Sequence, residues 1–218
     1  MKLEDNWHVH APWAPLVCIT KIPNDLFDKL NSIVNELWNR DDKKHVGERL
    51  VGQIRHEYEV PIEYLIESNL IDYMVSMGQK YWNTILTNGN MGTTLGINGV
   101  KNWQYALIAC WCNYMRENEY NPIHNHEGEI SAIIHLNSIK TTENIKSNIQ
   151  SDGKLFFLSG NTDNRLTESH WNITPEAGML YLFPSSLHHG VYPFVDKQER
   201  RSVSFNIGVK PDESQGAN

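Results

Sequence analysis

The sequence predicts one domain in which a helical N-terminal half packs against a β core of the sandwich or barrel type. Apolar residues recur at helical spacing before residue 103, whereas after it short runs rich in Ile, Val, Phe, Tyr and Trp alternate with Gly, Asn, Pro and Asp. The length of 218 residues suits a single substantial core. We therefore expect residues 1–102 to form the largely helical part and residues 103–210 the β core.

The N-terminal half is expected to contain a short strand and two helices. Residues 16–20, LVCIT, predict the strand. Residues 23–40 predict an amphipathic helix with Asn24 as its N-cap, because one stripe carries Leu26, Leu30, Ile33 and Leu37. A polar passage over 39–60 leads to residues 61–86, which predict a longer helix with Pro61 in its first turn and the NGNMG sequence, 88–92, at its end.

The C-terminal half is expected to be built from strands joined by close turns. Six segments carry the pattern, namely 103–117, 130–138, 154–160, 178–185, 190–195 and 201–209. Two stretches between them, 138–153 and 159–172, are polar and predict loops. The chain contains no internal repeat and no low-complexity tract, so a single fold unit is the simplest interpretation.

Composition excludes several classes of protein. The formal charge of -7 and the pI of about 5.8 argue against an electrostatic grip on nucleic acid or on an anionic membrane. No apolar run has the length of a signal peptide or a membrane span, so we expect a cytoplasmic protein. The cysteines, Cys18, Cys110 and Cys112, lack the spacing of a zinc site and are interpreted as small core residues.

Two histidine-rich stretches indicate a metal site. In NPIHNHEGEIS, residues 121–131, His124 and His126 are two apart, so a strand would turn both imidazoles to one side. A second His-x-His pair, His8 and His10, has no later partner in a comparable position. The stretch LYLFPSSLHHGVYPF, 180–194, delivers His188 and His189 after a Phe-Pro turn, where a barrel could return the chain to the first pair. Taken alone, the later pair fits exposed turn histidines better than metal ligands.

A polar face is predicted on the last strand. Alternation in ERRSVSFNIGV, 199–209, puts Arg200, Ser202, Ser204 and Asn206 on one face and the apolar residues on the other. If the polar face points into the barrel, the guanidinium needs an anion, because a buried charge must be paired. A dicarboxylic acid would satisfy it. If the polar face points to solvent, no ligand is needed, and periodicity alone leaves both arrangements open.

Taken together, PIHNHEGEIS, LFPSSLHHGVYPF and ERRSVSFN resemble the 2-oxoglutarate and Fe(II)-dependent oxygenase superfamily over about residues 105–210, and particularly oxygenase-like proteins of marine cyanophages. The resemblance implies a double-stranded β-helix, a jelly-roll core with iron at its open mouth, braced by two or more helices. It also implies Fe(II) as cofactor, 2-oxoglutarate as a small-molecule co-substrate and, for a phage protein, a location in the host cytoplasm.

The resemblance assigns roles to individual residues. His124 matches the first iron ligand, and His189 matches the distal one, because Leu187, His189 and Val191 fit the Leu-x-His-x-Val pattern. Arg200 matches the residue that binds the far carboxylate of 2-oxoglutarate, with Ser202 and Ser204 on its face. Tyr114 and His135 occupy positions at which prolyl-hydroxylase-like members carry co-substrate tyrosines.

The sequence departs from the family at the middle ligand. Most members have Asp or Glu two residues after the first histidine, and His126 stands there instead. A third imidazole would leave the ion more positive and change its redox behaviour, as in three-histidine cupin dioxygenases. Glu129 could supply a carboxylate if Gly128 turned it inward, whereas Glu127 has the wrong parity and is expected to be solvated. We favour His126, since positions i and i+2 share a strand face.

Three functions are compatible with the sequence. The first is an Fe(II) and 2-oxoglutarate-dependent dioxygenase that hydroxylates an unidentified substrate. The second is a cupin-like three-histidine metalloprotein that does not use 2-oxoglutarate. The third is a non-enzymatic jelly-roll module with a structural metal. The primary substrate and the oligomeric state have no signature in the sequence.

Overall fold

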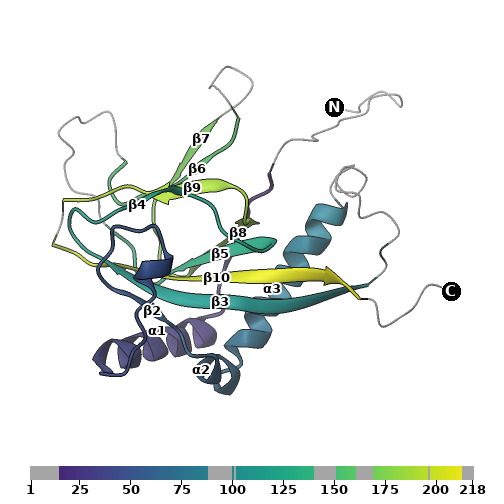
Figure 1. Ribbon diagram of the computed structural model, residues 1–218, viewed down its shortest axis with the longest axis horizontal. Coiled ribbons are helices and arrows are strands. Elements are labelled where there is room, and N and C mark those ends of the chain that lie inside the picture. Colours follow the sequence, from purple (N-terminus) through teal and green to yellow (C-terminus); the bar gives the residue numbers. More distant parts are fainter. Residues whose placement is uncertain are drawn as a thin grey trace.

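The computed structural model describes residues 15–87, 100, 102–139, 151–160, 169–195 and 197–212. Two antiparallel sheets face each other, and three helices cover the outer face of the larger sheet (Figure 1). This confirms the prediction of a mainly β core braced by helices. His8, His10 and the NGNMG sequence, residues 88–92, lie outside the described residues.

The helices follow the predicted apolar stripes but not all of the predicted boundaries. Helix α1 spans Asn24–Asn39, with Pro23 rather than Asn24 at the N-cap position and no side-chain cap. The longer helix expected over 61–86 is two helices, α2 (Ile62–Glu67) and α3 (Leu70–Thr87). The break lies at Asn69, whose φ of 60° is left-handed and ends helical continuity. Pro61 is the N-cap of α2 and precedes its first turn.

The larger sheet has six strands in the order β1-β8-β5-β10-β3-β2. Their bounds are β1 Cys18–Lys21, β2 Glu57–Glu59, β3 Trp103–Met115, β5 Ile130–His135, β8 Met179–Pro184 and β10 Arg200–Pro211. Strand β10 lies between β5 and β3, so both of its edges are hydrogen-bonded. This central position fixes the directions of the β10 side chains, which matter for the site.

The smaller sheet has four strands in the order β4-β9-β6-β7. They are β4 Asn121–His124, β6 Leu155–Leu158, β7 His170–Ile173 and β9 His188–Val191. The sequence did not predict β2 or β7, and it indicated β4 only as the extended backbone that carries His124; β7 begins in a stretch expected to be a loop. All three are short and polar, so neither length nor alternation marks them.

Each face of the larger sheet has its own core. Buried residues of α1 and α3, including Leu30, Val34 and Met74, pack with Val203 and Phe205 on the outer face. A second cluster, including Phe157, Tyr181 and Phe183, fills part of the space between the sheets. The larger sheet is therefore buried on both faces, as in a three-layer arrangement.

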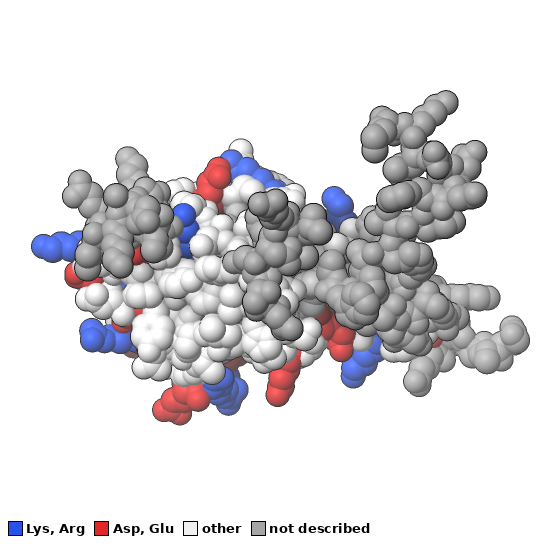
Figure 2. Space-filling model, turned by 90° about the horizontal axis from the view of Figure 1, so that it is seen from above, with Lys and Arg blue, Asp and Glu red and all other residues white. Residues whose placement is uncertain are grey.

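Charged side chains are dispersed over the molecular face that Figure 2 shows. Lys and Arg are interspersed there with Asp and Glu around the periphery, and much of the described surface between them is uncharged. That distribution differs from the clustered basic stripe typical of nucleic-acid binding. Among the described residues, no helix combines the length and apolar character that crossing a bilayer requires.

Candidate metal centre and adjoining cavity

Three histidines meet at one end of the space between the sheets. His124 ends β4 and lies directly opposite His189 on β9. His126 lies two residues beyond β4, where its backbone N–H donates to the Ser185 carbonyl at 2.9 Å. One ligand atom from each of the three imidazoles lies within 4.8 Å of the others. The structure thus brings together the three histidines that the sequence pattern selects, whereas His188 points outward and is exposed.

Hydrogen bonds fix the orientation of two of these rings. His124 Nδ1 lies 2.7 Å from the Pro122 carbonyl oxygen, and His189 Nδ1 lies 2.9 Å from the Leu187 carbonyl oxygen. A carbonyl only accepts, so each Nδ1 carries the hydrogen and each Nε2 keeps its lone pair. Backbone carbonyls commonly orient metal-ligating histidines in this way.

The rings are neutral near pH 7. Burial lowers the pKa of His126 to about 4 and that of His189 to about 3, with the neighbouring histidine His124 adding to both shifts. The pKa of His124 is also lowered, chiefly by burial. Neutral imidazole is the form that binds a metal ion, so the three side chains are ready ligands without first losing a proton.

The alternative carboxylate ligand is not part of the cluster. Glu129 Oε2 accepts a hydrogen bond from the Val209 backbone N–H at 2.8 Å, which holds the side chain against the end of β10. Glu127 is exposed, as its parity predicts. Among the described residues, the group that could hold a metal consists of His124, His126 and His189 and contains no acid.

Arg200 is buried at the other side of the cavity. The residue is 2% exposed, and its Nη1 and Nη2 lie 3.5 Å from Ser202 Oγ and from His135 Nδ1 respectively. Its Nε has no partner, and none of the ion pairs among the described residues involves it. Burial lowers the pKa of Arg200 to about 10, so the guanidinium is still charged at neutral pH. Such a cation calls for an anionic ligand.

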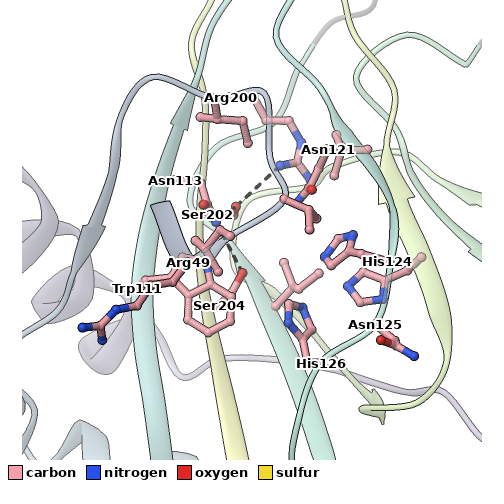
Figure 3. Close-up of a pocket in the computed structure, with 16 residues that line it drawn as sticks. Arg49, Trp111, Asn113, Asn121, His124, Asn125, His126, Arg200, Ser202 and Ser204 are labelled. Atoms are coloured by element: carbon pink, nitrogen blue, oxygen red, sulfur yellow. Dashed lines mark hydrogen bonds between the residues drawn. The ribbon is translucent and has the colours of Figure 1, made fainter. Parts of the chain in front are cut away.

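One cavity connects the histidines with the arginine. It has a volume of about 80 Å³, and its lining includes the three histidines together with Arg200, Ser202 and Ser204. Figure 3 shows His124 and His126 on one side and Arg200 with the two serines on the other. The polar face of β10 therefore points into the barrel, whereas Val203 and Phe205 pack toward the helices. The arrangement in which the polar face meets solvent is wrong.

Two further predicted residues take different positions. Tyr114 lies on the opposite face of β3 from the cavity, where its hydroxyl donates to the Val34 carbonyl of α1 at 2.5 Å. This corrects its expected place beside the co-substrate, because residues of odd and even number on β3 face different layers. His135 is fully buried behind the cavity beside Arg200, and burial together with that cation lowers its pKa well below the ordinary value.

Several lining residues had no sequence signal. Asn113 on β3 donates from Nδ2 to Ser204 Oγ at 3.4 Å, and Trp111 packs edge-on against His126 with ring centroids 5.5 Å apart. Both lie on the same face of β3, but the sequence does not indicate that this face, rather than the opposite one, lines the cavity. The segment from Arg49 to Ile54 covers the cavity from outside, and neither spacing nor composition indicates that role.

The donor set suits both an iron ion and 2-oxoglutarate. Three neutral imidazoles are suitable ligands for a divalent first-row metal, and the buried guanidinium with two serine hydroxyls matches a carboxylate. Facing antiparallel sheets that enclose this pair of features define a core of the double-stranded β-helix class with a candidate metal site.

Residues 109–206 match the family described as "Putative 2OG-Fe(II) oxygenase". Over these residues the chain is therefore similar to a family of oxidoreductases that use Fe(II) and 2-oxoglutarate. The comparisons give no support to the phage origin that the sequence resemblance implied. No curated protein matches the chain.

Solved structures show the same fold. A Pseudomonas putida prolyl-4-hydroxylase has a TM-score of 0.52 and 16% identity, covering 87% of this chain and 91% of its own. HygX from Streptomyces hygroscopicus, solved with nickel, 2-oxoglutarate and hygromycin B bound, has a TM-score of 0.55 and 12% identity, covering 90% and 83%. AviO1 from Streptomyces viridochromogenes Tue57 has a TM-score of 0.51 and 14% identity, covering 93% and 92%. At these identities the likeness establishes the fold alone.

Proposed function

We propose that the protein is an Fe(II) and 2-oxoglutarate-dependent dioxygenase that hydroxylates a C–H bond of a primary substrate. The observation that carries the proposal is the buried, unpaired Arg200 lining the same cavity as three neutral histidines. A structural metal site would explain the histidines but not a costly guanidinium behind them. A dicarboxylate spanning the cavity explains both.

Each side chain has a defined task in this proposal. His124, His126 and His189 hold the metal through their free ring nitrogens. Arg200 and the hydroxyls of Ser202 and Ser204 hold the far carboxylate of the co-substrate, and neutral His135 supports the guanidinium from behind. When bound, Fe(II) and 2-oxoglutarate supply oxidative decarboxylation to succinate and CO₂, with one atom of O₂ going to the substrate. Trp111, Asn113 and Ile133 restrict water around the reacting centre.

The primary substrate would approach from a larger groove beside His126. This groove has a volume of about 720 Å³ and shares Arg49, Leu50, Trp111, Asn125 and His126 with the smaller cavity. Its remaining wall combines apolar side chains, among them the exposed Ile62 and Ile108, with charged ones such as Lys44 and Glu63. An occupant of the groove would therefore present a carbon atom to the His126 side of the metal.

The test measures succinate release and metal content. Wild-type protein with Fe(II), 2-oxoglutarate and O₂ is expected to form succinate, and Arg200→Ala to form almost none while keeping its metal. Arg201→Ala is the matched control, since Arg201 lies on the other face of β10 and bonds Asn35. His189→Ala is expected to lose metal, whereas His188→Ala, a change at the exposed neighbour, keeps it. Equal succinate from Arg200→Ala and Arg201→Ala would refute the co-substrate assignment.

No acid among the described residues belongs to the histidine cluster, and this favours a second candidate, a three-histidine dioxygenase that binds its substrate directly to the metal. In that case 2-oxoglutarate would leave the melting temperature of the metal-loaded wild-type protein unchanged. A rise in that temperature that disappears in Arg200→Ala would favour the first candidate.

A further inference from the structure

A row of buried polar side chains crosses the larger sheet from β2 to β5. Glu57 lies opposite Asn113, Asn113 opposite Ser202, and Ser202 opposite His135. Directly opposed residues on neighbouring strands point to the same face, and here it is the cavity face, since Asn113 and Ser202 line it. None of the four is more than 7% exposed.

The first two members of the row, which are direct cross-strand neighbours, both carry buried polar atoms without a partner. Asn113 Nδ2 faces the serines, at 3.5 Å from Ser202 Oγ and 3.4 Å from Ser204 Oγ, whereas its Oδ1 is buried with no partner. Both carboxyl oxygens of Glu57 are buried and unpaired as well. A neutral carboxylic acid has one O–H to donate, and Asn113 Oδ1 is the unpaired acceptor of its cross-strand neighbour.

The surroundings of Glu57 favour the neutral acid. Two glycines pack closely against its carboxyl group: a Cβ added at Gly47 or Gly52 would come within 3.2 or 3.0 Å of a Glu57 carboxyl oxygen. Burial, together with the nearby Glu119, raises the pKa of Glu57 to about 7.

The basic side chains near Glu57 interact with other groups. Lys44 pairs with Glu59, and the exposed Arg55 side chain lies 3.8 Å from Glu119. His45 contacts the Arg55 carbonyl at 2.8 Å. Among the described residues, no cation forms an ion pair with Glu57, so nothing offsets the burial of its charged form.

We propose that Glu57 is a positioning residue for the 2-oxoglutarate pocket. As a neutral acid it donates to Asn113 Oδ1 and thereby holds Asn113 Nδ2 toward Ser202 and Ser204. Once ionised, Glu57 can only accept, so the Asn113 amide turns its Nδ2 toward Glu57 and its Oδ1 toward the bound carboxylate. Co-substrate affinity then falls. The identity of the ligand in this proposal rests on the proposed function, whereas the link between Glu57 and Asn113 does not.

The binding test measures the 2-oxoglutarate Kd of anaerobic, Fe(II)-saturated protein from pH 6 to 8.5. Wild-type affinity is expected to weaken about tenfold across this range, with a midpoint near pH 7. Glu57→Gln keeps a donor at every pH, so its affinity should stay tight and flat within about twofold, and Glu57→Leu should be weak throughout. In an Asn113→Ala background the Glu57 substitutions should have no further effect. The same pH profile in wild type and Glu57→Gln would overturn the proposal.

A second readout needs no co-substrate. The side-chain amide signals of Asn113 in a ¹⁵N spectrum, assigned by their loss in Asn113→Ala, should shift with a midpoint near pH 7 in wild type and stay fixed in Glu57→Gln. If no variant binds 2-oxoglutarate at any pH, the proposed function fails, and these signals still decide the Glu57–Asn113 link. Amide signals that ignore pH in wild type would refute that link even if 2-oxoglutarate binds.

Discussion

Without co-substrate, the buried charge of Arg200 should lower the stability of the protein relative to a variant with an uncharged side chain at this position. Burial lowers the pKa of this guanidinium from 12.5 to about 10, so the cost of holding the charge is present at every pH below about 10. At about 1.4 kcal/mol per pH unit, this cost is about 3 kcal/mol at pH 7. Its contacts to Ser202 and His135 are both 3.5 Å long, so they offset little of it.

Arg200→Met removes the charge and keeps an apolar side chain of similar length. At pH 7, without ligand, we expect the free energy of unfolding to rise by about 2–3 kcal/mol, which corresponds to roughly 5–10 °C in melting temperature for a domain of this size. Saturating 2-oxoglutarate, with metal, should raise the melting temperature of wild type and leave that of Arg200→Met unchanged.

The measurements are urea unfolding at pH 7 and thermal melts with and without co-substrate. Arg201→Met is the control, since Arg201 bonds Asn35 at 2.8 Å and lies 3.9 Å from Glu199, on the other face of the same strand. It should lose a little stability and keep its response to 2-oxoglutarate. If Arg200→Met were the less stable protein by more than about 1 kcal/mol, the guanidinium would be satisfied by the fold itself, and the argument for an anion site would fail.

The remaining predictions concern three other side chains. Tyr114→Phe removes the hydrogen bond to the Val34 carbonyl and should lower the free energy of unfolding by about 1 kcal/mol in urea titrations, with the 2-oxoglutarate Kd unchanged; a weakened Kd would return Tyr114 to the pocket. Glu129→Gln should bind one metal ion with wild-type affinity, as measured by elemental analysis after dialysis, because the Glu129 carboxylate bonds Val209; loss of metal would restore Glu129 as a ligand. The folded-state pKa of Glu57 is raised from 4.5 to about 7, so the stability that its neutral form contributes is fully present below pH 4.5 and is lost as the pH rises to 7. Across that window wild type should lose up to about 3 kcal/mol in free energy of unfolding relative to Glu57→Gln. Parallel curves of stability against pH for the two proteins would contradict the buried acid.

The sequence predicted site residues correctly where the pattern indicated which way a side chain points. It failed where a residue was chosen only by its number of positions from another one. His124 and His189 were selected from a strand edge and a turn, and the structure places them directly opposite each other on β4 and β9. Tyr114 was selected by its spacing from His124, which says nothing about the face of β3 it occupies. Because β3 carries buried side chains on both faces from Cys110 to Met115, hydrophobicity could not correct that choice.

His126 was selected for a reason that the structure changes. The prediction relied on two residues of one strand sharing a face, yet β4 ends at His124. His126 reaches the cluster because its backbone N–H bonds the Ser185 carbonyl, just after β8, and because Trp111 packs against its ring. Both are contacts between residues distant in sequence, and a single sequence does not report such contacts.

On β10, alternating polar and apolar residues do not mark one solvent-exposed face and one buried face. Polar and apolar residues alternate there as on a strand with one wet face, yet Arg200, Ser202, Ser204, Val203 and Phe205 are all at most 7% exposed. The two faces meet two interiors, one filled by helices and one containing a cavity. Burying a guanidinium without an anionic partner, and hydroxyls with only long contacts of 3.4–3.5 Å, lowers stability, and sequences keep such costs mainly where function requires them. The neighbouring strands and helices bury both faces of β10 at these positions. The polar side chains Arg200, Ser202 and Ser204 are therefore evidence for a ligand in the cavity that they line.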